Sequence, residues 1–92
     1  MTNKEYYIQS WEAAESHHCK ECGVYLPFFN PAFISHIISK GSHAGLKFHP
    51  RNHFILCFNC HQKYEFGDRK SMKIYEEGER IKSELLLEFY SK

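Results

Sequence analysis

The sequence lacks any apolar run that approaches the roughly 20 residues needed by a membrane-spanning helix. Its first residues, MTNKEY, lack the apolar core of a secretory signal peptide. No repeat, low-complexity segment or linker rich in Pro, Gly or Ser divides the 92 residues, a length that suits one domain. We therefore expect a single domain over residues 1–92 that is soluble, cytoplasmic and without a membrane partner, with its cysteines kept reduced. The sequence leaves the oligomeric state open.

The net charge of +1 conceals an uneven distribution. Residues 31–70 hold six Lys and Arg against two Asp and Glu, whereas residues 1–30 hold two against four. Five of the seven histidines lie in the same basic stretch. Concentrated positive charge favours a polyanionic partner such as nucleic acid, although a mixed solvated surface would give the same count.

Helical periodicity marks the N-terminal segment. Between about residues 4 and 15, apolar side chains recur at three- and four-residue spacing, and Thr2 or Asn3 can cap the first turn. Farther along, apolar β-branched residues predict strands over 32–38 and 53–56, joined by a loop over 40–51. Within that loop we expect a short extended piece over 46–48.

The C-terminal third predicts two more helices. The first covers about 57–66 and ends at Gly67, a residue typical of helix C-termini. The second covers about 71–90, with Ser71 as its cap, and Gly78 should weaken it by roughly 1 kcal/mol relative to alanine. Its apolar side chains share one face: Ile74, Ile81, Leu85 and Phe89. Together the elements predict a small α+β fold, with helices at about 4–15 and 71–90 flanking a core over about 19–67.

All four cysteines fall into two matched Cys-x-x-Cys pairs: Cys19 with Cys22, and Cys57 with Cys60. A two-residue spacer lets both sulfurs of a pair face one ion, and two pairs complete the tetrahedral sulfur set that structural Zn²⁺ prefers. We therefore predict a closed zinc site that stabilises the fold without acting on substrate. The spacing leaves open a dithiol redox pair, four unlinked core thiols, or His17 or His18 as a replacement ligand.

A second set of residues is spread over the predicted strands and helix. His36 lies near the middle of the first strand, Asn52 opens the second, and His61 directly follows Cys60. Asn52 and His61 are nine positions apart, with the second cysteine pair between them. Taken singly, each also fits a structural role in a half-buried strand, at a strand start or at the surface. Taken together, their order and spacing over about residues 19–63 resemble the HNH nuclease family.

The resemblance implies a ββα-metal fold in which the zinc pairs fix the hairpin to the helix. It implies that His36 is the general base, that Asn52 hydrogen-bonds across the loop and orients His36, and that His61 binds a catalytic Mg²⁺ or Mn²⁺. The activity implied is that of a metal-dependent DNA endonuclease. Ser35 stands where many family members carry an acidic or histidine metal ligand. A catalytically degraded nucleic-acid-binding or protein-interaction module is therefore the alternative.

The basic stretch supplies candidate contacts to the nucleic-acid backbone, namely Lys40, Lys47, Arg51 and Lys63. The glycines of the loop would let its backbone approach a phosphate. For His49 and His53 three roles stay open: a metal ligand in place of the missing one, a contact to phosphate, or a surface side chain. The run SHIISKG also resembles NinG-type phage recombination proteins. We expect the partner to be duplex, branched or single-stranded DNA, recognised with little sequence specificity.

Overall fold

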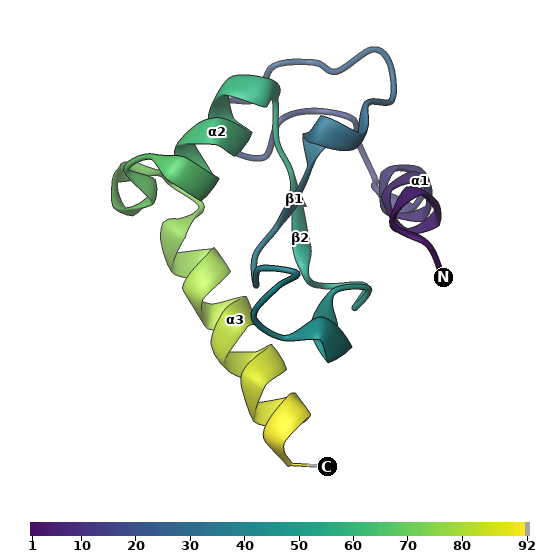
Figure 1. Cartoon of the computed structure of the whole chain (residues 1–92). Coiled ribbons are helices and arrows are strands. Elements are labelled where there is room, and N and C mark those ends of the chain that lie inside the picture. Colours follow the sequence, from purple (N-terminus) through teal and green to yellow (C-terminus); the bar gives the residue numbers. More distant parts are fainter. Residues whose placement is uncertain (92) are drawn as a thin grey trace.

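A computed structural model describes residues 1–91 and contains, within them, three α-helices and one two-stranded sheet (Figure 1). In chain order the elements are α1 (Asn3–Ala13), β1 (Ile34–His36), β2 (His53–Ile55), α2 (Phe58–Phe66) and α3 (Tyr75–Tyr90). Short 3₁₀ turns lie at Pro31–Phe33, Ala44–Leu46 and Arg69–Ser71. The predicted α+β class is therefore confirmed.

The sheet separates two groups of buried side chains. β1 and β2 are antiparallel, with Ile34 opposite Ile55 and His36 opposite His53. Because successive side chains of a strand point to opposite faces, these residues face α1, while Ser35 and Phe54 face the other side. On the α1 side the buried cluster comprises Tyr6, Trp11, Leu26, Ile34 and Ile55. On the other side Phe54 and Leu56 pack with residues of α2 and α3, which cover that face (Figure 1).

Local sequence signals set the ends of α1 and α2. Thr2 caps α1 through a reciprocal capping box, in which its hydroxyl accepts from the Glu5 amide and the Glu5 carboxylate accepts from the Thr2 amide. α2 stops at Gly67, as predicted. Both helices therefore follow from residues at their own termini.

Two predicted strand segments are shorter or absent. β1 begins only at Ile34, because the Asn30 side chain accepts from the Ala32 amide and starts a 3₁₀ turn through Pro31. The predicted extended piece over 46–48 is wrong: residues 44–46 form another 3₁₀ turn. A Cβ on Gly45 would lie 2.8 Å from the Phe89 ring. This glycine therefore permits close packing of the loop on α3. Its role here is structural, whereas the sequence led us to expect that the loop glycines let the backbone approach a phosphate.

The last helix starts four residues later than predicted. Ser71 does not cap it, because its hydroxyl donates to the Asp68 carbonyl and Met72 is extended. Instead the Glu21 carboxylate accepts from the amides of Lys73 and Ile74, each at 3.0 Å. Glu21 lies between the first two cysteines, so the start of α3 is fixed by a residue 53 positions away.

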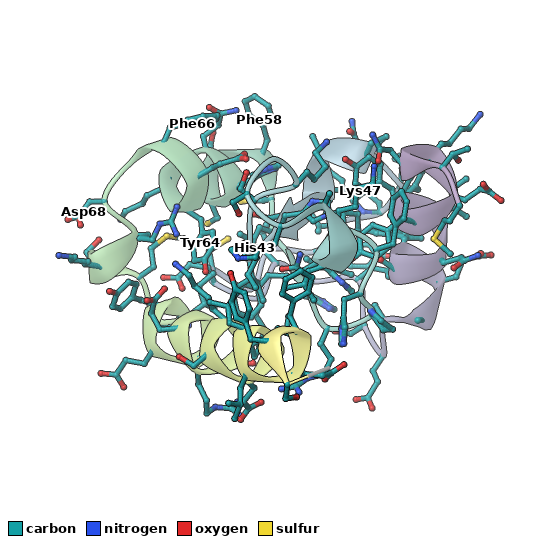
Figure 2. All side chains as sticks on the ribbon, turned by 60° about the horizontal axis from the view of Figure 1, so that its bottom comes forward. His43, Lys47, Phe58, Tyr64, Phe66 and Asp68 are labelled. Carbon is teal, nitrogen blue, oxygen red and sulfur yellow. The ribbon has the colours of Figure 1, made fainter. Side chains whose placement is uncertain are left out.

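Gly78 of α3 is buried against Tyr64 of α2 and Phe54 of β2. A Cβ at this position would collide with the Tyr64 hydroxyl and lie 3.2 Å from the Phe54 ring. Tyr64 lies between α2 and α3 (Figure 2), and its hydroxyl has no hydrogen-bond partner among the described residues. We therefore expect Gly78→Ala to destabilise the domain by about 1–3 kcal/mol through overpacking, against the roughly 1 kcal/mol gain that helix propensity alone predicts.

Urea denaturation of Gly78→Ala and of Gly78→Ala combined with Tyr64→Phe measures this effect. The double variant should recover most of the loss, because removing an unsatisfied buried hydroxyl costs little and opens the space. Ser83→Ala, at an exposed position of α3, is the control and should gain a few tenths of a kcal/mol. Equal stabilisation by both alanines would contradict the packing explanation.

Candidate functional site

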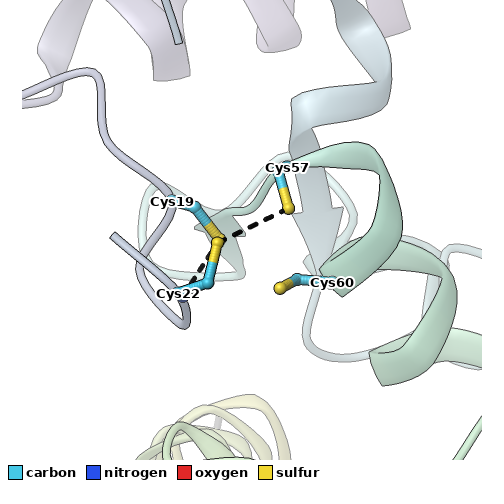
Figure 3. A group of neighbouring side chains, drawn as sticks. All are labelled: Cys19, Cys22, Cys57 and Cys60. Carbon is cyan, nitrogen blue, oxygen red and sulfur yellow. Dashed lines mark hydrogen bonds between the residues drawn. The ribbon is translucent and has the colours of Figure 1, made fainter. Parts of the chain in front are cut away.

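The four cysteines meet at one point (Figure 3). Cys19 and Cys22 come from a turn closed by the bridge between His18 and Tyr25, while Cys57 caps α2 and Cys60 lies in its first turn. Their sulfur atoms all lie within 4.8 Å of one another, and the sulfurs of Cys22 and Cys57 are 3.8 Å apart. Four cysteines this close are compatible with a zinc site.

The environment of the thiols suits a bound cation. Burial acts to raise the pKa of Cys19, but backbone N–H groups of Cys22, Cys57 and Glu21 outweigh it and lower that pKa to about 7. Burial and the neighbouring thiols raise the pKa of Cys60. Because four thiolates at this separation repel one another, a dication is the partner that lets all four ionise.

Neither neighbouring histidine belongs to the cysteine cluster. His17 stacks on the Trp11 indole at 3.7 Å between ring centroids, and its Nε2 lies 3.0 Å from the Trp11 carbonyl oxygen. His18 is exposed beside the Tyr25 ring. The cluster is therefore formed by the four sulfurs, and His17 belongs to the packing of α1.

Next to β1 a separate pocket of about 280 Å³ gathers ionisable side chains from three parts of the chain. It is lined by His36 from β1, by His61 and Glu65 from α2, and by Lys40 and Tyr7. Two of the three residues in the predicted His, Asn, His set thus face the same space. Asn52 is fully buried and does not line the pocket.

His36 is held in one orientation by its surroundings. Its Nε2 lies 2.8 Å from the Lys47 carbonyl oxygen, which can only accept, so Nε2 carries a proton and donates it. Nδ1 is then the basic nitrogen. The ring stacks on Tyr6 at 5.3 Å between centroids. Burial, and next the charge of Lys40, lower the pKa of His36, so the imidazole is neutral at neutral pH.

Asn52 is fully buried and ties the loop together. Its Nδ2 donates to the carbonyls of Ile38 at 3.1 Å and Leu46 at 3.0 Å, and its Oδ1 accepts from the Ile38 amide at 2.6 Å. The Leu46 carbonyl directly precedes Lys47, whose own carbonyl holds His36. Asn52 therefore makes hydrogen bonds across the loop, and these fix the acceptor that sets the His36 tautomer.

His61 faces Glu65 one helical turn farther along α2. The Nδ1 of His61 donates to the Ala32 carbonyl, and its Nε2 lies 2.8 Å from a Glu65 carboxylate oxygen. The His61 amide donates to the Cys57 carbonyl at 2.9 Å, so His61 lies in the first turn of α2 beside two of the clustered cysteines. Glu65 was missed in the sequence, although its i+4 spacing from His61 on a predicted helix was visible.

The remaining candidates lie outside the pocket or are held by other residues. Ser35 is fully buried on the opposite face from His36, and its hydroxyl has no partner within residues 1–91. Lys47 lies over the Phe48 ring at 4.9 Å, and Arg51 forms an ion pair with Glu84 of α3. Lys63 is exposed on α2. Of the four predicted phosphate contacts only Lys40 therefore lines the pocket, and Arg51 is already paired.

His49 and His53 contribute to the structure of the hairpin and α3. His49 lies 3.4 Å from a Glu88 carboxylate oxygen. His53 lies 3.2 Å from the Tyr6 hydroxyl, and burial lowers the pKa of His53 to about 4. His53 is therefore a neutral packed residue, and neither histidine lines the pocket of His36 and His61.

None of the helices within residues 1–91 has the length and apolar character that crossing a bilayer requires. Comparison of the chain with family models, with curated proteins and with solved structures gives no match. Function is therefore inferred from the side chains of the pocket and the cysteine cluster.

Proposed function

We propose that this domain is a metal-dependent endonuclease of the HNH type, which hydrolyses DNA phosphodiester bonds with little sequence specificity. The observation that carries the proposal is the single pocket lined by a neutral histidine, a second histidine and a carboxylate. Within residues 1–91 the Nδ1 of the first histidine, His36, makes no hydrogen bond. A base and a pair of metal ligands are the groups that metal-assisted hydrolysis of a phosphodiester requires.

In this proposal His36 acts as the general base. Its Nδ1 takes a proton from a water molecule as the water oxygen bonds to phosphorus. The bond from phosphorus to the 3′-oxygen breaks, and the departing oxygen takes a proton from solvent water, which leaves a 5′-phosphate and a 3′-hydroxyl. Asn52 acts as a positioning residue, because its three hydrogen bonds fix the loop whose Lys47 carbonyl holds the imidazole.

His61 Nε2 and the Glu65 carboxylate would hold the catalytic ion, Mg²⁺ or Mn²⁺. Bound there, the ion supplies positive charge for the phosphate and the departing 3′-oxygen. The buried Ser35 hydroxyl cannot take part, so Glu65 supplies the carboxylate that the sequence lacks beside His36. Cys19, Cys22, Cys57 and Cys60 would hold a separate structural Zn²⁺.

A zinc-stabilised binding module is the second candidate. The observation that favours it is the direct contact of His61 with Glu65, which satisfies both side chains without a metal ion. In such a module the exposed Lys40 and Lys63 and the half-buried Lys47 would contact DNA phosphates, and no bond would be cleaved.

Nicking of supercoiled plasmid in a titration of Mg²⁺ or Mn²⁺ distinguishes the two candidates. We expect Glu65→Gln to raise the metal concentration for half-maximal nicking about 10- to 100-fold. The substitution replaces the anionic carboxylate ligand with a neutral amide and leaves His61 as the other ligand. Glu76→Gln, at an exposed position of α3, should behave as the wild type. A wild-type protein that binds DNA and cleaves none with either ion would instead establish the binding module.

A further inference from the structure

One wall of the pocket comes from α1, outside the stretch that carries the family resemblance. Tyr7 projects from this helix, and Lys40 follows β1 at the start of the loop. The Lys40 Nζ lies 3.0 Å from the Tyr7 hydroxyl oxygen and 5.8 Å from the centre of its ring. Tyr7 also meets the His36 ring edge to face, at 6.1 Å between centroids. The pair therefore stands beside the proposed base.

Hydrogen-bond accounting shows what this pair can do. An ammonium group only donates, so the Tyr7 oxygen accepts from Lys40 and its own proton must point elsewhere. Within residues 1–91 the Tyr7 hydroxyl makes no other hydrogen bond, so its own proton has no acceptor there. Accepting from a cation polarises the O–H bond and makes it a stronger donor. Lys40 also retains N–H groups for a second oxygen.

We infer that Tyr7 and Lys40 form a phosphate-binding site, in which the Tyr7 hydroxyl and the Lys40 ammonium donate to non-bridging oxygens of the phosphate attacked beside His36. The inference rests on the proposed function and names the groups that hold its substrate. An exposed contact between lysine and tyrosine contributes little to stability, so its position in this pocket fits binding better than folding. The pair supplies hydrogen-bond donors that can bind a phosphate anion, whereas the Glu65 carboxylate is an anion and would bind the metal ion.

The first test is plasmid nicking by Tyr7→Phe, which removes one oxygen and keeps the ring. We expect kcat/KM to fall about 10- to 100-fold, as for loss of one donor to a charged transition state. Lys40→Met should lower it at least as much, and the double variant should cost little more than Lys40→Met, because the lysine polarises the hydroxyl. Tyr25→Phe, on the cysteine turn, is the matched control and should match the wild type.

The second test measures binding without cleavage. In a His36→Ala background, fluorescence anisotropy with a labelled 20-nucleotide DNA reports affinity over a salt titration. We expect Tyr7→Phe to weaken binding several-fold with an unchanged salt slope, whereas Lys40→Met should also reduce the slope by about 1. Zinc content and circular dichroism verify that each variant is folded. If Tyr7→Phe does not fold, the nicking and binding of Lys40→Met test the phosphate site.

The outcomes separate this inference from the proposed function. Lower nicking with unchanged affinity places the contact in the transition state and supports the pair. If the wild type cleaves nothing and Tyr7→Phe still weakens DNA binding, the endonuclease proposal fails and the phosphate site stands. Tyr7→Phe and Lys40→Met that both match Tyr25→Phe in nicking and affinity overturn the inference, whatever the activity of the wild type.

Discussion

Removing zinc is expected to unfold this domain. The cysteine cluster joins the turn that holds Cys19 and Cys22 to the start of α2, and Cys19 itself is buried in the main core. Structural zinc contributes about 10–16 kcal/mol in small zinc-binding peptides, as much as or more than the net stability of about 5–15 kcal/mol that whole domains have. Cys60→Ser, or a strong chelator applied to the wild type, should therefore abolish the cooperative thermal transition.

Metal analysis and thermal denaturation measure this prediction. We expect about one zinc ion per chain in the wild type, and much less in Cys60→Ser. Restoring zinc to the chelated protein should restore the transition, and chelator saturated with zinc beforehand should have no effect. His18→Ala is the control, because this exposed residue adjoins Cys19 and lies outside the cluster. A metal-free protein with an unchanged melting transition would refute the zinc site.

His36→Ala is expected to lower the nicking rate by about 10²- to 10⁴-fold, the usual contribution of a general base. Secondary structure and zinc content should stay as in the wild type, since His36 ends a strand beside a pocket. Added imidazole should restore part of the activity by filling the space left by the ring. Full activity in His36→Ala would assign the base to another residue.

The pH dependence gives an independent check on the same residue. A base works only when neutral, and burial together with Lys40 lowers the pKa of His36 below its ordinary value of 6.5. Activity should therefore reach half its plateau below pH 6.5 and fall as the pH drops further. Placing a dication nearby would move this midpoint in the same direction. A midpoint above pH 6.5 would contradict the assigned environment of His36.

Features encoded by neighbouring residues could be predicted from the sequence. The capping residues of α1 and the end of α2 at Gly67 depend on spacing within one or two turns. The meeting of the two distant Cys-x-x-Cys pairs was predicted from the four-sulfur set that zinc prefers. The burial of Ser35 could also have been anticipated, because neighbours in a strand point to opposite faces and His36 faces the pocket. Local rules therefore account for most of the framework.

Other features depend on contacts between distant segments. The start of α3 is set by Glu21, and no property of residues 71–75 reveals that partner. From the sequence alone, Gly78 only lowers the stability of the helix. The structure shows that Tyr64 packs against it and leaves no room for a side chain. Tyr7 belongs to an apolar stripe in the sequence, and only the fold brings its hydroxyl to Lys40. Tertiary packing gave these residues roles that periodicity could not assign.

The contact of Glu21 with α3 also bears on the order of folding events. α3 has no side-chain cap of its own at Ile74, and the amides that precede its first turn find their acceptor on the turn between Cys19 and Cys22. A loop of this length must close before the helix gains that acceptor, and closing it costs chain entropy. The start of α3 is therefore expected to become ordered only once the turn that holds Cys19 and Cys22 is in place, so the zinc-binding turn and the C-terminal helix should gain stability together.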